Sequence, residues 1–226
     1  MGTKIKLTAA DGHQLGAYHA APGNSVQPAV VVIQEIFGVN SHIRAVADDF
    51  AAQGYHAIAP QLFDRAEPGV ELGYNPADMQ RGIGVATKIG MENALKDVAA
   101  AIDYAHQKLG CPKVGVVGYC FGGSLAWLAA TRLQPAAAVG YYGGRIAQYA
   151  AEKPGCPVLL HFGALDPHIP VSEIDKIRGH HPELPVYVYR AGHGFNCDQR
   201  KDYEPQSALL ARQRTLEFLR KYLSKE

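Results

Sequence analysis

The sequence predicts an α/β protein with a doubly wound, mostly parallel sheet, an N-terminal antiparallel hairpin and helices on both faces. First, residues 29–33 form an unbroken β-branched run, which is typical of strands buried on both faces of a parallel sheet. Second, strand segments alternate with amphipathic helical segments, the pattern of βαβ units. Third, the 226 residues are 47% apolar and 19% charged. This is enough for one large core, so we expect a single domain over residues 1–226.

The N-terminal half begins with the hairpin. Residues 4–8 alternate in polarity, Asp11-Gly12 is a turn signal, and residues 14–19 return as a second strand. Further along, a capping Asn40 and helical spacing of apolar residues predict the next helix. We expect that helix at residues 43–51 and a short strand at 55–59. A loop rich in Pro and Gly should follow at residues 61–90, with one helix at 77–88. A long amphipathic helix is expected at residues 92–109.

The C-terminal half repeats strand and helix four times. The expected strands are at residues 113–118, 136–141, 157–162 and 185–189. The expected helices are at residues 121–133, 146–152, 172–178 and 204–223. Because sites in such sheets lie beyond the carboxyl ends of the strands, the residues just after each strand are the candidates for chemistry.

The most informative motif is Gly118-Tyr-Cys120-Phe-Gly122, which follows one strand and opens a helix. It has the G-x-C-x-G form of a nucleophile elbow, with Cys where Ser usually stands. The flanking glycines remove side chains where strand and helix crowd together, and the helix N-terminus favours a thiolate. We therefore interpret Cys120 as a nucleophile, the alternatives being a buried structural cysteine or a phosphate-binding loop.

A thiol nucleophile of this kind needs a base and an acid that follow it in the chain. His193 stands between two glycines after the strand at 185–189, and Asp166 follows the strand at 157–162. We predict His193 as the base and Asp166 as its orienting carboxylate. Weaker candidates are other histidines and aspartates in the same half: His161, His168, His180, His181, Asp198 and Asp202.

The first buried strand ends in Gln34-Glu35-Ile36. In folds with such an elbow, the oxyanion hole uses the amide after the nucleophile and a second amide from an earlier strand end. We expect Phe121 and Ile36 to supply these amides. An acidic Glu35 at the tip of an apolar strand is costly unless it is paired, so we expect it to have a role beside Cys120, the alternative being a structural ion pair.

These motifs resemble the dienelactone hydrolase (carboxymethylenebutenolidase) family of the α/β-hydrolase fold. The resemblance rests on residues 34–40, 115–123, 139–143 and 191–195 and extends over nearly the whole chain. It implies a Cys-His-Asp triad at Cys120, His193 and Asp166, with Glu35 contacting the resting thiol. It also implies lactone or ester hydrolysis through a thioester that water cleaves.

The resemblance further implies two arginines that hold the substrate carboxylate. Arg81 corresponds to the first, and we expect Arg81 and Tyr141 to contact the substrate. Where the second arginine belongs, this sequence has Cys197. Arg200 can replace it only if the loop differs. The resemblance therefore supports the reaction chemistry more strongly than it supports the identity of the substrate.

Composition excludes several other functions. The net charge is +1 without a basic stripe, so we expect no nucleic-acid or membrane partner. We expect no metal or cofactor, since C-x-x-C, G-x-G-x-x-G and the Walker lysine are missing. No signal peptide is visible, which predicts a cytoplasmic location, and we expect a monomer or weak homodimer. The alternative functions are a hydrolase-fold binding or sensor protein with slow or no turnover, and a redox sensor.

Overall fold

A computed structural model describes residues 2–23 and 27–224. The chain divides into two compact units, Met1–Val116 and Val117–Glu226, and each is described by itself. The expectation of a single domain stays a prediction.

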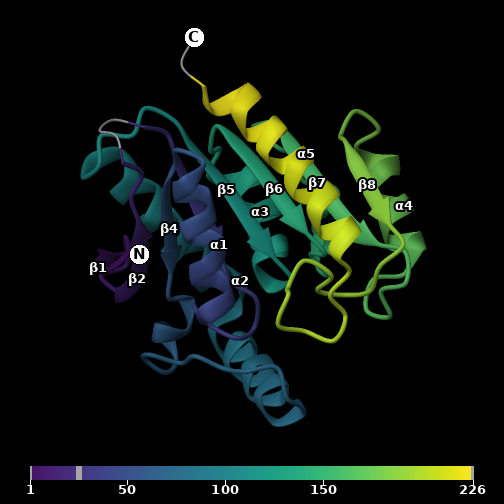
Figure 1. The fold of residues 1–226 in the computed structure, drawn as a ribbon, viewed down its shortest axis with the longest axis horizontal. Helices are drawn as coiled ribbons and strands as arrows, with labels where there is room; N and C mark the ends of the chain where they lie inside the picture. The colour runs from purple at the N-terminus through teal and green to yellow at the C-terminus, as the bar shows by residue number, and fades with distance from the viewer. Residues whose placement is uncertain (1, 24–26, 225–226) are drawn as a thin grey trace. The chain divides into compact units, whose positions relative to one another are not determined.

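The first unit contains the expected hairpin (Figure 1). Strand β1 (Thr3–Thr8) pairs antiparallel with β2 (Gln14–Ala20), which pairs antiparallel with β4 (His56–Pro60). Strand β3 (Ala29–Ile33) runs parallel to β4, and all five of its residues are buried, as the β-branched run predicts. The strand order in this unit is β1-β2-β4-β3.

Two helices cover the strands of the first unit. Helix α1 (Ser41–Ala52) begins at Asn40, whose side-chain oxygen accepts a hydrogen bond from the Ile43 N–H, as the cap predicts. Helix α1 packs on β4 in front of the strands, and α2 contacts β4 and β3 from behind (Figure 1). A short 3₁₀ helix, η1 (Leu62–Arg65), follows β4.

Helix α2 (Pro76–Gln107) is longer than either helix expected in this region. Asn75 caps it by accepting the Asp78 N–H, and Pro76 suits its first turn. Gly90 (φ 71°, ψ 165°) interrupts it, so the expected helices at 77–88 and 92–109 are its two halves. The expected loop at 61–90 is correspondingly shorter, because Asn75 and Pro76 start the helix.

The second unit is parallel. The boundary between the units falls within β5 (Val114–Tyr119), and β6 (Ala137–Tyr141), β7 (Val158–Gly163) and β8 (Val186–Tyr189) follow in spatial order. Strand β7 is parallel to both β6 and β8. The carboxyl ends of these strands therefore point the same way, and the loops that follow them meet at one edge.

Helices cover both faces of the second unit as well. Helix α3 (Phe121–Arg132) packs on β6 from behind, and α5 (Pro205–Leu223) crosses β6 and β7 in front (Figure 1). Helix α4 (Val171–His180) follows β7. The helix expected at 146–152 is only a 3₁₀ turn, η2 (Ile146–Tyr149). The predicted class, a mostly parallel α/β protein with an antiparallel N-terminal hairpin, is confirmed.

Candidate active site

Cys120 stands at the turn between β5 and α3 with a backbone φ of 54° and ψ of −111°. A positive φ is unfavourable for a residue with a Cβ and is found mostly at sites that the surroundings over-determine. A side chain on Gly118 would collide with the Gly122 carbonyl, and one on Gly123 with the Tyr141 carbonyl. The glycines therefore allow the strained turn that presents the thiol.

The loops after β7 and β8 bring Asp166 and His193 to this thiol. The Cys120 Sγ lies 3.1 Å from the His193 Nε2, and the His193 Nδ1 lies 2.7 Å from the Asp166 Oδ2. The other oxygen of Asp166 accepts the His168 N–H at 2.8 Å. The three residues predicted from strand order thus form one continuous hydrogen-bonded chain, with Asp166 holding the ring of His193.

The charges of the hydrogen-bonded series Cys120–His193–Asp166 favour a protonated imidazole on His193. Burial is the largest single effect on His193 and by itself disfavours the imidazolium. The negative charge of Cys120 and the hydrogen bond that the His193 Nδ1–H donates to Asp166 outweigh burial and raise the pKa of His193 to about 10. The arrangement is therefore suited to an imidazolium–thiolate pair, which is the reactive form of a cysteine nucleophile.

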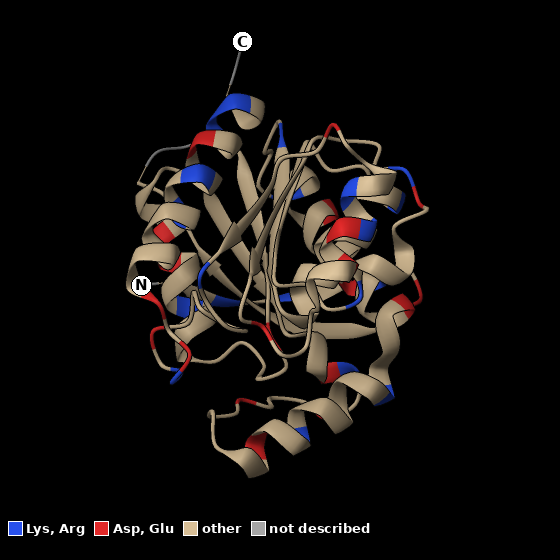
Figure 2. Cartoon of the chain, turned by 90° about the vertical axis from the view of Figure 1, so that its right-hand side faces the viewer, with Lys and Arg blue, Asp and Glu red and all other residues tan. Residues whose placement is uncertain are grey.

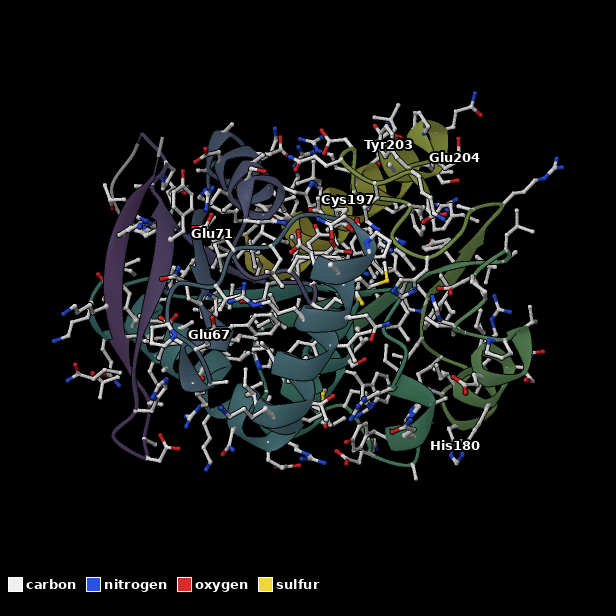
Figure 3. All side chains as sticks on the ribbon, turned by 90° about the horizontal axis from the view of Figure 1, so that it is seen from below. Glu67, Glu71, His180, Cys197, Tyr203 and Glu204 are labelled. Carbon is white, nitrogen blue, oxygen red and sulfur yellow. The ribbon has the colours of Figure 1, made fainter. Side chains whose placement is uncertain are left out.

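The rival histidines lie elsewhere in the second unit. His161 is fully buried and bonded to Tyr189 and Thr215. His168 packs its ring edge-to-face against His193 with centroids 5.2 Å apart. His180 lies at the end of α4, well apart from Cys197 and the loop after β8 (Figure 3). Among the described histidines, only His193 has a ring nitrogen within hydrogen-bonding distance of the Cys120 sulfur.

The expected oxyanion donors belong to different units. Phe121 is the first residue of α3, so its N–H is one of the helix-start amides that have no acceptor within the helix. In the first unit, Glu35 (1% exposed) and Ile36 follow β3, and the Ile36 carbonyl lies where a Cβ on Gly82 would be. Helix α2 thus passes close to the loop after β3 because residue 82 is glycine.

The two residues expected to bind substrate have other partners. Arg81 forms an ion pair with Glu67, and both side chains are half exposed. Tyr141 is buried, and its hydroxyl lies 2.7 Å from the Thr215 Oγ1. Burial raises the pKa of Tyr141 well above its ordinary value. This geometry gives the Tyr141 side chain a structural place, so its expected substrate contact finds no support.

A cation does lie beside the triad histidine, and it belongs to Arg200. A Cβ on Gly194 would overlap the Arg200 guanidinium, so this group rests against the backbone next to His193. Gly194 also has a φ of +78°, which favours glycine. Cys197, in the position of the missing second arginine, is buried. The cation beside His193 is therefore that of Arg200, three residues beyond the position that Cys197 occupies.

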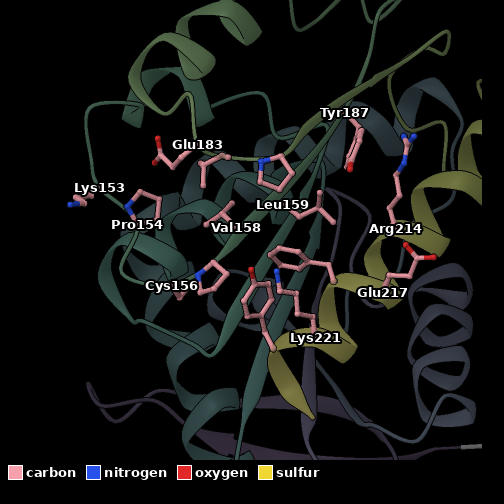
Figure 4. Close-up of a pocket in the computed structure, with 15 residues that line it drawn as sticks. Lys153, Pro154, Cys156, Val158, Leu159, Glu183, Tyr187, Arg214, Glu217 and Lys221 are labelled. Carbon is pink, nitrogen blue, oxygen red and sulfur yellow. The ribbon is translucent and has the colours of Figure 1, made fainter. Parts of the chain in front are cut away.

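A cavity of about 650 Å³ lies at the other end of the second unit (Figure 4). It is lined by residues at the starts of β7 and β8 and by the second half of α5, including Cys156, Tyr187, Arg214, Phe218 and Lys221. No triad residue lines it. This cavity is therefore separate from the candidate reactive site, which rests on the geometry around Cys120.

Three further observations bear on binding partners. Basic and acidic residues are interspersed along the helices (Figure 2). Within residues 2–23 and 27–224, no helix is both long and apolar enough to cross a membrane. None of the four cysteines, all in the described part of the chain, forms a disulfide.

Residues 15–223 match the model of the dienelactone hydrolase family. A carboxymethylenebutenolidase from Pseudomonas putida is 37% identical over 232 aligned positions, covering 98% of this chain and 98% of its own. A carboxymethylenebutenolidase from Cupriavidus pinatubonensis is 30% identical, covering 95% of both chains.

Solved structures agree. A protein assigned as a dienelactone hydrolase, from Klebsiella pneumoniae, superposes with a TM-score of 0.86 at 30% identity, covering 98% of this chain and all of its own. An esterase from Pyrococcus furiosus superposes with a TM-score of 0.72 at 14% identity, covering 99% and 93%. This second likeness supports the fold alone, which is that of the α/β-hydrolases.

Proposed function

The chain belongs to the dienelactone hydrolase family and is a hydrolase of lactones or esters, and from this premise we propose that it acts through a thioester on Cys120. The observation that carries the proposal is the chain from Cys120 Sγ to His193 Nε2 at 3.1 Å and from His193 Nδ1 to Asp166 Oδ2 at 2.7 Å. A thiolate, a proton carrier and an orienting carboxylate are the groups that acyl transfer needs.

In the first step the Cys120 thiolate adds to the carbonyl carbon. The resulting oxyanion accepts the Phe121 N–H at the start of α3. As the carbon–oxygen bond to the leaving alkoxide breaks, the His193 imidazolium gives that oxygen its Nε2 proton. In a lactone the freed hydroxyl stays attached to the acyl group, so the product of this step is a ring-opened thioester.

In the second step His193 changes from acid to base. Its pKa is raised to about 10 mainly by the charge of Cys120, and thioester formation removes that charge. Burial then has less opposition, so the neutral ring becomes more favourable than in the resting protein. Neutral His193 takes a proton from water, the hydroxide attacks the thioester, and the carboxylic acid product leaves while the Cys120–imidazolium pair forms again.

Two residues of the first unit are included on the strength of the family resemblance. Ile36, just after β3, is proposed as the second oxyanion donor through its N–H. Glu35 is proposed to contact the resting thiol and assist its deprotonation. We expect Glu35→Gln to slow acylation more than deacylation, because only the first step starts from the free thiol.

We further propose that the substrate carries a carboxylate that Arg200 binds. The name of the Pseudomonas putida relative denotes action on a butenolide with a carboxymethylene group, and the Arg200 guanidinium against Gly194 lies next to His193. Guanidinium binds carboxylate in a bidentate manner. Arg81 remains a second proposed contact, although its ion pair with Glu67 would have to open.

The deciding experiment is hydrolysis of a dienelactone and of an activated aryl ester by wild type, Cys120→Ser and Cys120→Ala. Wild type should turn over, and brief mixing followed by mass spectrometry should detect the acyl group on Cys120. Cys120→Ala should lose turnover by about 10³-fold or more. Full activity in Cys120→Ala would refute the thioester mechanism.

The same assay addresses the binding or sensor alternative. A sensor would acylate once and release little product, giving a burst without a steady rate. Sustained hydrolysis of many equivalents would exclude that reading. For the redox reading, peptide mapping after mild peroxide would have to find a Cys120 disulfide or sulfenate.

A further inference from the structure

A chain of buried hydrogen bonds joins β6, β7, β8 and α5 in the second unit. At its centre is His161 on β7, which is 0% exposed. Its Nδ1 lies 2.8 Å from the Tyr189 hydroxyl on β8, and its Nε2 lies 3.0 Å from the Thr215 Oγ1 on α5. Thr215 in turn lies 2.7 Å from the Tyr141 hydroxyl on β6.

Each of these strands leads to, or holds, part of the triad. His161 precedes Asp166 on the same strand and loop, and Tyr189 precedes His193 in the same way. The Tyr141 carbonyl accepts the Cys120 N–H at 3.0 Å. The spacing of the three strand ends, and so of the triad, therefore depends on the groups that join them.

The direction of the hydrogen bonds follows from Arg214. A guanidinium can only donate, and the Arg214 Nη1 lies 3.1 Å from the Tyr189 hydroxyl. Tyr189 therefore accepts from Arg214 and gives its own proton to the His161 Nδ1. The His161 Nε2–H then donates to Thr215, which uses both nitrogens of a neutral ring.

The surroundings keep this ring neutral. Burial, and secondly the charge of Arg214, lower the pKa of His161 to about 3. Arg214 is itself held in place, because its guanidinium lies 3.9 Å from the Tyr187 ring centroid. Arg214 and Tyr187 line the 650 Å³ cavity (Figure 4).

Packing alone would not require this arrangement. Buried polar groups cost free energy unless they are satisfied, whereas an apolar residue in the middle of β7 would avoid that cost. A fully connected network fixes relative positions because each hydrogen bond has a narrow range of distance and angle. Here the positions that it fixes are those of the strand ends.

We propose that His161 is a positioning residue for the hydrolysis, joining Tyr189 and Thr215 so that the β6, β7 and β8 ends hold Cys120, His193 and Asp166 in line. This inference rests on the thioester function proposed above. It adds residues that never touch the substrate.

The test compares variants that each remove one partner of His161, together with that partner's second hydrogen bond to Tyr141 or Arg214, with controls that keep both partners. Thr215→Val removes the acceptor of His161 at nearly constant volume, and Tyr189→Phe removes its donor. Thr215→Ser keeps the oxygen. Tyr187→Phe is the matched control on the same strand, because the Tyr187 ring stacks beside His161 (ring centroids 6.0 Å apart) and no hydrogen bond joins its hydroxyl to the described residues.

We expect Thr215→Val and Tyr189→Phe to lower kcat by about tenfold with KM nearly unchanged, since small misplacements of reacting groups cost rate. The rate at which iodoacetamide alkylates Cys120 near neutral pH should fall in both, because a misplaced imidazolium stabilises the thiolate less. Thr215→Ser and Tyr187→Phe should resemble wild type.

Wild-type kcat and alkylation profiles in both Thr215→Val and Tyr189→Phe would overturn the proposal. The proposal would also be overturned if Tyr187→Phe lost as much kcat as Thr215→Val and Tyr189→Phe, and if the loss in each variant followed its decrease in Tm. That result would indicate a general packing role. If Thr215→Val does not fold, Tyr189→Phe and His161→Gln decide by the same criteria. If wild type hydrolyses no ester, the thioester function fails, while the alkylation profiles still test the alignment.

Discussion

The guanidinium of Arg200 lies against the backbone of Gly194, in the space that a Cβ would fill. Gly194 directly follows His193, so the missing side chain leaves room for a cation beside the reactive chain. Arg200, six residues beyond Gly194 in the sequence, therefore supplies a guanidinium in the loop where Cys197 stands in place of the second arginine that the family resemblance implies. We expect removal or displacement of this guanidinium to change which substrates the enzyme prefers.

Arg200→Gln should reduce kcat/KM for an anionic lactone far more than for a neutral aryl ester. A charge-assisted hydrogen bond to a carboxylate is worth about 1.5–3 kcal/mol, which corresponds to roughly ten- to hundredfold. The measurement is the ratio of kcat/KM for the two substrates in wild type and variant, with Arg178→Gln, which removes an exposed cation that pairs with Asp175 on α4, as the control. An unchanged ratio in Arg200→Gln would refute the anchor.

Gly194→Ala should displace the same guanidinium without removing it. The new methyl group would overlap Arg200, and the φ of +78° adds strain of about 1 kcal/mol or more. We expect a loss of preference for the anionic lactone together with a lower Tm. If Tm falls while the preference stays, Arg200 acts from another position.

Asp166→Asn should preserve the fold but impair turnover. The Asp166 carboxylate accepts from the His193 Nδ1 at 2.7 Å and from the His168 N–H at 2.8 Å. An amide can present its NH₂ to Nδ1 and so favour the wrong tautomer. In a serine triad, the same change lowers kcat by about 10⁴-fold. Steady-state kcat with a Tm control measures this, and a loss below tenfold would indicate that Asp166 is dispensable.

The proximity of Cys120, His193 and Asp166 could be predicted from the sequence because the signals are local. Cys120, Asp166 and His193 each follow a strand, and strand ends meet at one edge of a parallel sheet. The sequence does not predict Arg200, because its position depends on how the loop after β8 folds around Gly194.

The buried network is harder to predict than the triad. The signal available was a histidine in the apolar strand 158–163, since a buried imidazole requires partners. Those partners, Tyr189 and Thr215, lie 28 and 54 residues away along the chain. Only the packing of β8 and α5 against β7 identifies them. The length of α2 was missed for a different reason, because its glycines and Pro76 resemble a loop in composition.

Cys120 should react fast with iodoacetamide near neutral pH. The pKa of His193 is raised to about 10, so its imidazolium persists through the neutral range beside the sulfur. His193→Ala removes this cation and should slow the alkylation of Cys120 near neutral pH. An identical alkylation rate in the variant would refute the ion pair.

Stability of the first unit should depend on Arg65. Its guanidinium binds the fully buried Asp97 carboxylate at 2.7 and 2.9 Å. Removing the cation leaves an uncompensated buried charge, so Arg65→Ala should lower the free energy of unfolding by about 3–5 kcal/mol. Urea unfolding measures this, and Arg81→Ala, which breaks the exposed pair with Glu67, should cost only about 0–1 kcal/mol.

The pH dependence of that loss has a definite sign. Burial is the largest effect on Asp97 and raises its pKa despite Arg65. In Arg65→Ala the attraction that opposes burial is gone, so the folded pKa rises further above the unfolded value. An acid with a raised folded pKa destabilises the fold above that pKa, and the cost disappears as pH falls through it. The stability difference from wild type should therefore shrink between neutral and mildly acidic pH. A difference that grows over this range would show that Arg65 stabilises the unit by some means other than compensating Asp97.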